Sequence, residues 1–162
     1  MFSGEEFVET LNELRITHVV TVPDSTIGQW QGAIRSSRTI RLISVCREGE
    51  AWHVAAGLWL GGARPLVLIQ CTGLFESGDA LRNALFDYRI PLPAIIGYRS
   101  YLDESTLPGD TARIYTEPVL KGWGLDSRLI TDPSQRAVIS THLAACAAAE
   151  KPGIVLIAEG RA

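Results

Sequence analysis

The sequence predicts an α/β fold in which one doubly wound parallel sheet carries helices on both faces. Strand-like and helix-like segments alternate along the whole chain of 162 residues. Several strand-like segments are apolar throughout, as is typical of parallel strands that are covered on both sides. Because no linker, repeat or low-complexity stretch interrupts the alternation, we expect residues 1–162 to form one domain.

The first half of the chain begins with a helix and then alternates strands and helices. Residues 3–14 carry apolar side chains at helical spacing, and Ser3 and Glu6 match a capping box. The β-branched run 17–22 stops at Pro23, which predicts a short buried strand. The next predicted elements are a helix over 26–37, a strand over 40–45, and a helix that begins near Glu48 and ends at Gly61 and Gly62.

The second half continues the same alternation. The apolar runs 65–71 and 92–98 predict buried strands, and residues 74–87 between them predict a helix. Residues 99–112 are rich in Gly, Pro, Asp and Ser, and a loop of this length suggests a functional role. The remaining predicted elements are a helix around 113–121, a strand over 127–131, an Ala-rich helix over 134–149 and a strand over 153–158.

Composition argues against several classes of function. A net charge of −3 without a basic cluster argues against nucleic-acid binding, and no run approaches the ~20 apolar residues of a membrane span. The acidic N-terminal segment does not resemble an export signal, and the three cysteines, Cys46, Cys71 and Cys146, predict reduced thiols, so we expect a cytoplasmic protein. The apolar content of 46% predicts an interface with another subunit, across which Trp52 and Trp59 could pack.

The common nucleotide and nucleophile motifs are missing from the sequence. There is no phosphate loop of the G-x-x-x-x-G-K-[ST] kind, no G-x-G-x-x-G after the first strand and no G-x-S-x-G elbow, which disfavours a flavodoxin-like mononucleotide binder. The cysteines lack metal-ligand spacing, and His18, His53 and His142 are scattered. The sequence therefore predicts no metal site in this chain and no complete active site of its own.

Polar residues nevertheless follow the predicted strands. In parallel sheets, ligands bind beyond the carboxyl ends of the strands. The helix that follows the second strand opens with Glu48 and Glu50, although most of that helix is apolar. A buried carboxylate is costly unless the site needs it; the alternative is a favourable interaction with the helix N-terminus.

The segment REGEAWHVAAGLWLGGARPLVLIQCTGL (47–74) resembles the pyrimidine-binding domain of thiamine-diphosphate-dependent 2-oxoacid decarboxylases. In that family a Glu opens a helix, and counting back nine positions from Gly57 gives Glu48 rather than Glu50. Within the family, a VPDS-like turn (22–25) and a QNSGLGN-like segment (70–76) are similar to phosphonopyruvate and sulfopyruvate decarboxylases. The likeness extends over nearly the whole chain, to the strand GIVLIA.

The resemblance implies a role for each candidate residue. Glu48 would be the catalytic residue, hydrogen-bonding N1′ of the aminopyrimidine of thiamine diphosphate and so activating the cofactor. The other implied cofactor ligands are Gln70, Thr72 and Gly73, for which a role in the turn alone is the alternative. The implied substrate ligands are Asp24, Ser25, Arg99 and Arg113, with an Asx turn or helix cap as the alternative for Asp24 and an ordinary surface position for the arginines.

Departures from the family pattern bear on partners and substrate. The chain lacks the G-D-G and N-N motifs that hold the cofactor diphosphate through a metal, which implies a separate β-type subunit that binds Mg²⁺. Phe75 and Glu76 replace the Gly and Asn of the family segment, and only Asp103 and Glu104 match a DEPQH-like sequence after Tyr98. We therefore expect an α-type subunit of a hetero-oligomeric decarboxylase that also self-associates and acts on a small 2-oxoacid, sulfopyruvate or phosphonopyruvate. A carboligase subunit and a non-catalytic regulatory or binding domain are the alternatives.

Overall fold

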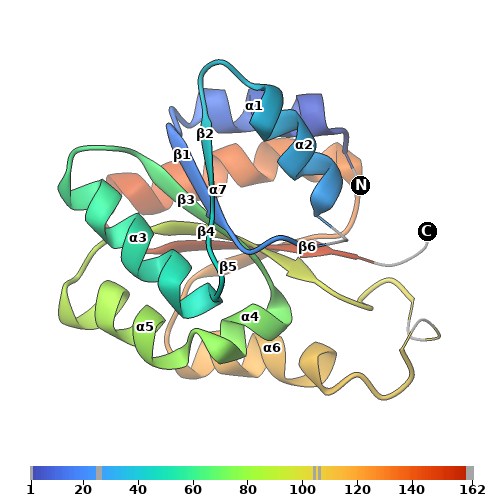
Figure 1. The fold of residues 1–162 in the computed structure, drawn as a ribbon. Coiled ribbons are helices and arrows are strands. Elements are labelled where there is room, and N and C mark those ends of the chain that lie inside the picture. Colours follow the sequence, from blue (N-terminus) through green and yellow to red (C-terminus); the bar gives the residue numbers. More distant parts are fainter. Residues whose placement is uncertain (1, 25–26, 104, 106, 160–162) are drawn as a thin grey trace.

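The computed structural model describes residues 2–24, 27–103, 105 and 107–159. Six parallel strands form one sheet in the order β2-β1-β3-β4-β6-β5, and helices cover both faces (Figure 1). The strands are β1 (His18–Thr21), β2 (Arg41–Ser44), β3 (Pro65–Gln70), β4 (Pro93–Tyr98), β5 (Ser127–Ile130) and β6 (Gly153–Ala158). The predicted α/β fold class is confirmed.

The helices lie in two layers, one on each face of the sheet (Figure 1). One layer holds α1 (Gly4–Glu13), α2 (Gly28–Ser36) and α7 (Arg136–Ala148), which follows a 3₁₀ turn (Pro133–Gln135). The other layer holds α3 (Glu48–Leu60), α4 (Cys71–Glu76), α5 (Gly78–Arg82), a π-helical turn (Asn83–Asp87) and α6 (Thr111–Gly122). No helix in the described ranges has the length and apolar character that a bilayer span requires.

The sheet separates two apolar cores. Under α1 and α2, the rings of Phe7 and Trp30 stack with centroids 4.3 Å apart, and the Trp30 indole nitrogen donates to the Phe2 carbonyl. The predicted capping box of Ser3 and Glu6 is present and starts α1. On the other face, α3 packs Ala51, Trp52, Ala55 and Ala56 against the sheet. Burial of these side chains anchors the helix that begins with Glu48.

Trp52 and Trp59 have different environments. The Trp52 side chain is fully buried inside this chain, whereas Trp59 is 40% exposed near the end of α3. The expectation that both tryptophans pack across a subunit interface is therefore wrong for Trp52, because its ring fills the core between α3 and the sheet. Trp59 remains accessible to another chain.

The segment after β3 differs most from the prediction. Instead of one helix over 74–87, α4 begins at Cys71, directly after the last residue of β3, and the chain continues through α5 into the π-helical turn. There the backbone amide of Tyr88 donates to the backbone carbonyl of Asn83. The Asp87 carboxylate accepts from the Arg82 guanidinium and from the side-chain amide of Asn83. These side-chain bonds tie the ends of the widened turn, which apolar periodicity does not reveal.

The strand order reverses twice across the sheet. From β1 the chain passes to β2 on one side, and then through α3 to β3 on the other side of β1. A second reversal lies at β6, which is inserted between β4 and β5. Ligands of doubly wound sheets bind at such reversals, beyond the carboxyl ends of the strands.

Candidate functional site

Glu48 lies at the carboxyl edge as the first residue of α3. Arg47 precedes it in an extended conformation, and Glu48 is partly buried. Its side chain rests directly on the backbone of Gly73: a Cβ atom at position 73 would lie 2.7 Å from Glu48 Oε1 and 2.8 Å from Cδ. Only a residue without a side chain leaves the Glu48 carboxylate where it is, so the absence of a Cβ at position 73 is a requirement of this site.

Glu50 has a different role from Glu48. Its side chain turns back along the chain, and Oε2 accepts a hydrogen bond of 3.0 Å from the backbone amide of Cys46. Glu50 is exposed and belongs to the first turn of α3. Glu50 therefore ties the turn that leads into α3, and Glu48 is the carboxylate that faces the neighbouring helix α4.

Glu76 fastens α4 to the start of α3. Its Oε2 accepts a 2.7 Å hydrogen bond from the backbone amide of Gly49, and its Oε1 accepts a 2.9 Å bond from Arg47 Nε. The carboxylate thus satisfies one of the free amides of the α3 N-terminus, on the residue next to Glu48. The sequence presents Glu76 only as a departure from the family's Asn; the structure shows it holding the two helices that carry Glu48 and Gly73.

Gln70 and Thr72 lie between the end of β3 and Gly73. Both are partly buried, and the Thr72 hydroxyl donates a 3.1 Å hydrogen bond to the Gln70 side-chain oxygen. The Gly73 carbonyl accepts from the buried Ser77 hydroxyl, which ties the first turn of α4. The structure therefore places Gln70, Thr72 and Gly73 in succession at the carboxyl end of β3, and Gly73 lies against Glu48.

Asp24 follows β1 at the same edge. Its Oδ1 accepts a 3.2 Å hydrogen bond from the backbone amide of Ile27, which closes the turn before α2. This bond is the turn-forming role expected as the alternative for Asp24, and it leaves the carboxylate partly buried at the edge. Ser25 lies outside the described residues.

Arg99 follows β4 and forms an ion pair across the long loop. Its Nε and Nη2 atoms donate to the two carboxylate oxygens of Asp110 at 2.9 and 3.0 Å. The Asp110 side chain is 5% exposed and also caps α6 by accepting from the amide of Ala112. The hydrogen bonds from Arg99 lower the pKa of Asp110, and the same bonds raise the pKa of Arg99. Arg99 is thus already engaged by a carboxylate of its own chain.

Arg113 lies on the first turn of α6 and is partly buried. Its guanidinium stands 6.0 Å from the ring centroid of Tyr101, a residue of the loop after β4. The Tyr98 hydroxyl donates a 2.7 Å bond to the Arg113 carbonyl, and burial raises the Tyr98 pKa to about 12. The ring of Tyr98 also contacts that of Tyr101, so Arg113 and the loop form one packed unit.

Glu159 is a buried carboxylate that the sequence analysis did not single out. It follows β6, is only 2% exposed and packs its side chain against Gly97. Its backbone amide donates to the Tyr98 carbonyl, and its carbonyl accepts from Leu102, which holds the loop to the sheet. The sequence signal that could have identified Glu159 is its position, as an acidic residue directly after a wholly apolar strand.

Cys71 lies close to these charges at the start of α4. Burial raises the pKa of its thiol, and the hydrogen bond that involves the Arg99 backbone opposes this effect. The thiol is fully buried and belongs to the core under α4. Cys71 is therefore protonated at neutral pH, as expected of a structural cysteine.

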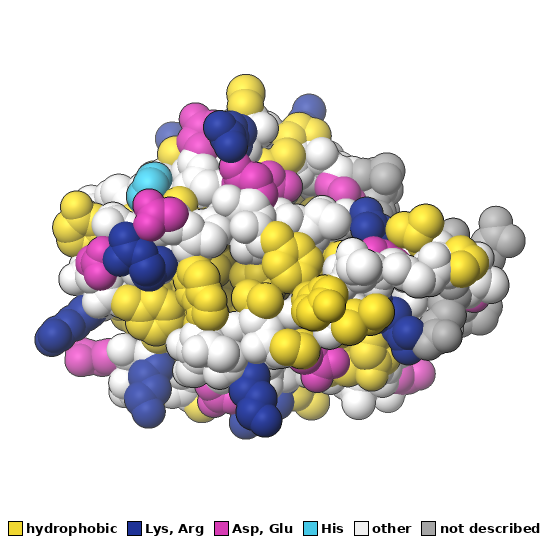
Figure 2. Space-filling model, turned by 90° about the horizontal axis from the view of Figure 1, so that it is seen from below, with side chains coloured by type: hydrophobic (Ala, Val, Ile, Leu, Met, Phe, Trp, Pro, Cys, Tyr) yellow, Lys and Arg dark blue, Asp and Glu magenta, His cyan; other side chains and the backbone are white. Residues whose placement is uncertain are grey.

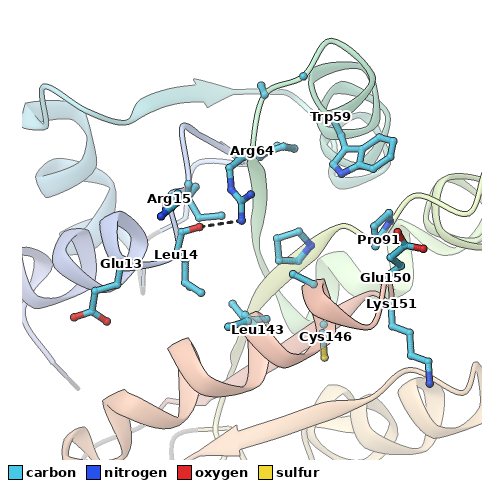
Figure 3. A pocket seen from close by; sticks show the side chains of 18 residues that line it. Glu13, Leu14, Arg15, Trp59, Arg64, Pro91, Leu143, Cys146, Glu150 and Lys151 are labelled. Carbon is cyan, nitrogen blue, oxygen red and sulfur yellow. Dashed lines mark hydrogen bonds between the residues drawn. The ribbon is translucent and has the colours of Figure 1, made fainter.

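A cavity of about 640 Å³ lies at the opposite edge of the sheet (Figure 3). Its lining includes Pro65, Pro93 and Gly153, the first residues of three strands. The guanidinium of Arg64 is held there by a 3.4 Å bond to the Leu14 carbonyl. We assign the candidate site to the carboxyl edge instead, because carboxylate, amide and hydroxyl groups lie there and the strand order reverses there, where ligands of doubly wound sheets bind.

Comparisons with known proteins identify the family of the chain. The family model described as "Thiamine pyrophosphate enzyme, N-terminal TPP binding domain" matches residues 1–117. Phosphonopyruvate decarboxylase of Streptomyces hygroscopicus is 34% identical over 108 residues, which are 67% of this chain and 27% of that protein. Sulfopyruvate decarboxylase of Methanosarcina acetivorans is 24% identical over 153 residues, 94% of this chain and 39% of that protein.

A shorter relative is similar over a larger share of its own length. Sulfopyruvate decarboxylase subunit alpha of Methanococcus maripaludis is 29% identical over 104 residues, 64% of this chain and 62% of that subunit. The chain spans well under half the length of the Streptomyces and Methanosarcina relatives. Because the family model covers more than two thirds of the chain, the protein belongs to the thiamine pyrophosphate enzymes and carries their N-terminal, cofactor-binding domain.

Proposed function

We propose that the chain is the α-type subunit of a thiamine-diphosphate-dependent decarboxylase, with residues 1–162 forming its pyrimidine-binding domain. The similarity to proteins named phosphonopyruvate decarboxylase and sulfopyruvate decarboxylase supports this class of reaction. The observation that carries the proposal is the position of Glu48, partly buried at the carboxyl edge and resting on Gly73. A carboxylate placed there can meet a ligand in the crevice between β1 and β3.

The residues present fit an aminopyrimidine ring. Glu48 offers a carboxylate that can share a proton with the ring nitrogen N1′, while the Gln70 amide and Thr72 hydroxyl offer hydrogen-bonding groups beside it. Gly73 lets the backbone of α4 lie directly against the Glu48 side chain, because a side chain at position 73 would occupy the place of the Glu48 carboxylate. Thiamine diphosphate, when bound, supplies the ring that accepts the electrons released as a 2-oxoacid loses carbon dioxide.

Two residues near Glu48 prepare the site without contacting the ring. Glu50 accepts a hydrogen bond from the backbone amide of Cys46 in the turn before α3, and Glu76 accepts one from the amide of Gly49 in its first turn. Glu48 is then left to act on a ligand rather than on its own helix. Its partial burial reduces competition from water for any proton that it shares.

We further propose that a separate β-type subunit binds the diphosphate and Mg²⁺. Three relatives are named as alpha subunits, which supports a partner chain. Apolar side chains gather on the face formed by α3–α6 (Figure 2), where Phe75 on α4 and Tyr115 on α6 are 38% and 56% exposed. Such a face suits subunit contacts, either with the β-type subunit or with a second copy of this chain.

The proposed substrate is sulfopyruvate or phosphonopyruvate, a small 2-oxoacid with an anionic group. Asp24, Ser25, Arg99 and Arg113 are the residues of this chain proposed to contact it. A guanidinium suits a tetrahedral oxyanion because it donates two parallel hydrogen bonds. Since Arg99 already bonds to Asp110, a substrate anion would have to share it with that carboxylate.

The test is to express the chain with a subunit that bears G-D-G and N-N, and to measure carbon dioxide release from sulfopyruvate, phosphonopyruvate and pyruvate. Arg99→Ala or Arg113→Ala should weaken use of the anionic substrates about tenfold or more and spare pyruvate. Asp110→Asn is the matched control, because it removes the ion pair but keeps the guanidinium of Arg99. A wild-type enzyme that prefers pyruvate would contradict the substrate assignment, and a carboligation product in place of the free aldehyde would contradict the assignment as a simple decarboxylase.

The need for a partner has a separate test. Isothermal titration of thiamine diphosphate and Mg²⁺ into the isolated chain should show weak binding or none, because the diphosphate anchor lies on the other subunit. A dissociation constant of about 1 μM or tighter for the isolated chain would overturn the two-subunit assignment.

A further inference from the structure

Three potential metal ligands meet at the amino edge of the sheet, away from the candidate site. Asp126 directly precedes β5, and His142 and Cys146 lie one turn apart on α7. A carboxylate oxygen, an imidazole nitrogen and the Cys146 sulfur all lie within 4.8 Å of one another. His142 and Cys146 are 6% and 7% exposed, whereas Asp126 reaches solvent. The described structure thus combines nitrogen, sulfur and oxygen donors in one place.

We propose that Asp126, His142 and Cys146 bind a single divalent metal ion of the zinc class. Cys146 Sγ lies 3.8 Å from each of the two His142 ring nitrogens, so the imidazole must turn until one nitrogen and the sulfur can share an ion at the Zn–N and Zn–S lengths of about 2.0 and 2.3 Å. One thiolate, one imidazole and one carboxylate form a donor set that suits Zn²⁺ better than Mg²⁺ or Ca²⁺. Three protein ligands leave the fourth position for water.

The backbone holds two of these ligands at fixed places. The Asp126 carbonyl accepts a 3.1 Å bond from the amide of Ile154, which fixes the start of β5 against β6. Gly153 lets α7 approach β6 closely, because a Cβ there would lie 2.9 Å from Cys146 Cβ and 3.1 Å from Sγ. Figure 3 shows the Cys146 sulfur directed away from Arg64. The backbone positions of Asp126 and Cys146 are therefore fixed, and binding an ion requires rotation of side chains, chiefly of the His142 ring.

A cavity of about 460 Å³ beside these residues gives an ion a route from solvent. It is lined by all three ligands and also by Arg128 and Lys151. Arg128 donates a 2.7 Å bond to one oxygen of Asp126, which leaves the second oxygen for a metal. The negative charges of the Asp126 carboxylate and the Cys146 thiolate offset a dication, while the two basic residues reduce its affinity.

This site is independent of the proposed decarboxylase function. It lies where β5 and β6 begin, whereas Glu48 lies beyond the ends of the strands, so it does not serve the diphosphate of the cofactor. A bound ion would join α7 to the start of β5 and would stabilise the folded chain. Failure of the metal site would leave the assignment of Glu48 intact.

The test is titration of the full chain with Zn²⁺, and with Co²⁺ as an optical probe. Wild type should bind one Zn²⁺ with a dissociation constant of about 1 μM or tighter, raising its melting temperature by about 5–10 °C at saturating metal. Co²⁺ should give a thiolate charge-transfer band. Asp126→Asn and Cys146→Ser should each weaken binding about tenfold or more, and the cysteine variant should lose the band.

Two controls and a fold-neutral variant keep the result interpretable. Cys46→Ser and His53→Ala remove an exposed thiol and an exposed imidazole elsewhere and should leave affinity unchanged. Asp126→Asn alters a side chain that is 55% exposed, so its loss of binding would not reflect unfolding. Absence of Zn²⁺ binding by wild type, a Co²⁺ complex without the thiolate band, or loss of binding in Cys46→Ser would overturn the proposal; the His142–Cys146 contact would then be a hydrogen bond alone.

Discussion

Gly73→Ala is the change that most directly probes how Glu48 is positioned. The added Cβ would come closest to Glu48 Cγ and would lie 2.7 Å from Oε1, so the whole side chain must shift, by more than the about 0.7 Å that Oε1 alone needs to reach an ordinary contact of about 3.4 Å. The obstructing atoms belong to the Glu48 side chain, which can rotate, so the cost in unfolding free energy should stay below about 1 kcal/mol. Since a misplacement of about 1 Å can cost a hundredfold in rate, we expect kcat/KM to fall about tenfold to a hundredfold.

The assay is steady-state decarboxylation by the reconstituted enzyme, together with urea denaturation of the isolated chain. Gly78→Ala is the matched control, because a Cβ at position 78 meets no atom within 4 Å. That variant should retain activity and gain up to about 1 kcal/mol of helix stability. Full activity of Gly73→Ala, or an equal loss in Gly78→Ala, would refute the argument that an open backbone at position 73 places Glu48.

Two further predictions concern groups that support the site. Glu76→Ala removes the acceptor for the Gly49 amide and the partner of Arg47, so the free energy of unfolding should fall by about 1 kcal/mol in urea denaturation, whereas Glu76→Gln should cost less because it still offers an oxygen. An undiminished free energy in the alanine variant would contradict the cap. The pKa of Asp110 is lowered by Arg99, so its contribution to stability is present above the unfolded pKa of about 3.9 and is lost as pH falls through the lower folded pKa. Asp110→Asn should therefore be less stable than wild type at pH 7 and lose less stability between pH 4 and pH 2; parallel pH profiles would contradict this.

Much of the fold could be predicted from the sequence because its signals are local. Each strand is a short apolar run bounded by turn residues, and each helix on the α1 and α7 layer has caps or periodicity within its own segment. The break between α4 and α5 and the π-helical turn could not be predicted this way. They depend on bonds such as that from Arg82 to Asp87, which apolar periodicity does not encode.

The candidate site was predictable only in part, for the same physical reason. Glu48 was distinguished from Glu50 by its distance from Gly57, and in the structure Glu50 accepts a hydrogen bond from the Cys46 amide in the turn before α3. The hydrogen bond from the Gly49 amide to Glu76 joins residues 27 positions apart, and no local sequence pattern predicts such a contact.

Other long-range contacts were missed as well. Arg99 was expected to be available to a substrate, but its carboxylate partner lies 11 residues away across the loop. His142 and Cys146 are four residues apart, which is helical spacing, yet they were treated separately because the third ligand, Asp126, precedes a different strand. Sequence patterns identified residues of the right chemistry, and tertiary packing determined which of them meet.

The most direct test of the central claim compares Glu48→Gln with Glu50→Gln in the enzyme assembled from this chain and its β-type subunit. Both changes replace a carboxylate by an amide of the same shape at the start of α3. Comparing them therefore distinguishes the loss of a proton shared by Glu48 from a change in the hydrogen bond between Glu50 and the Cys46 amide. We predict that Glu48→Gln keeps the fold and cofactor binding but loses on the order of a hundredfold or more in turnover, whereas Glu50→Gln loses less than about tenfold. Equal losses from the two variants, or little loss from Glu48→Gln, would contradict the assignment of Glu48 as the carboxylate that activates the cofactor.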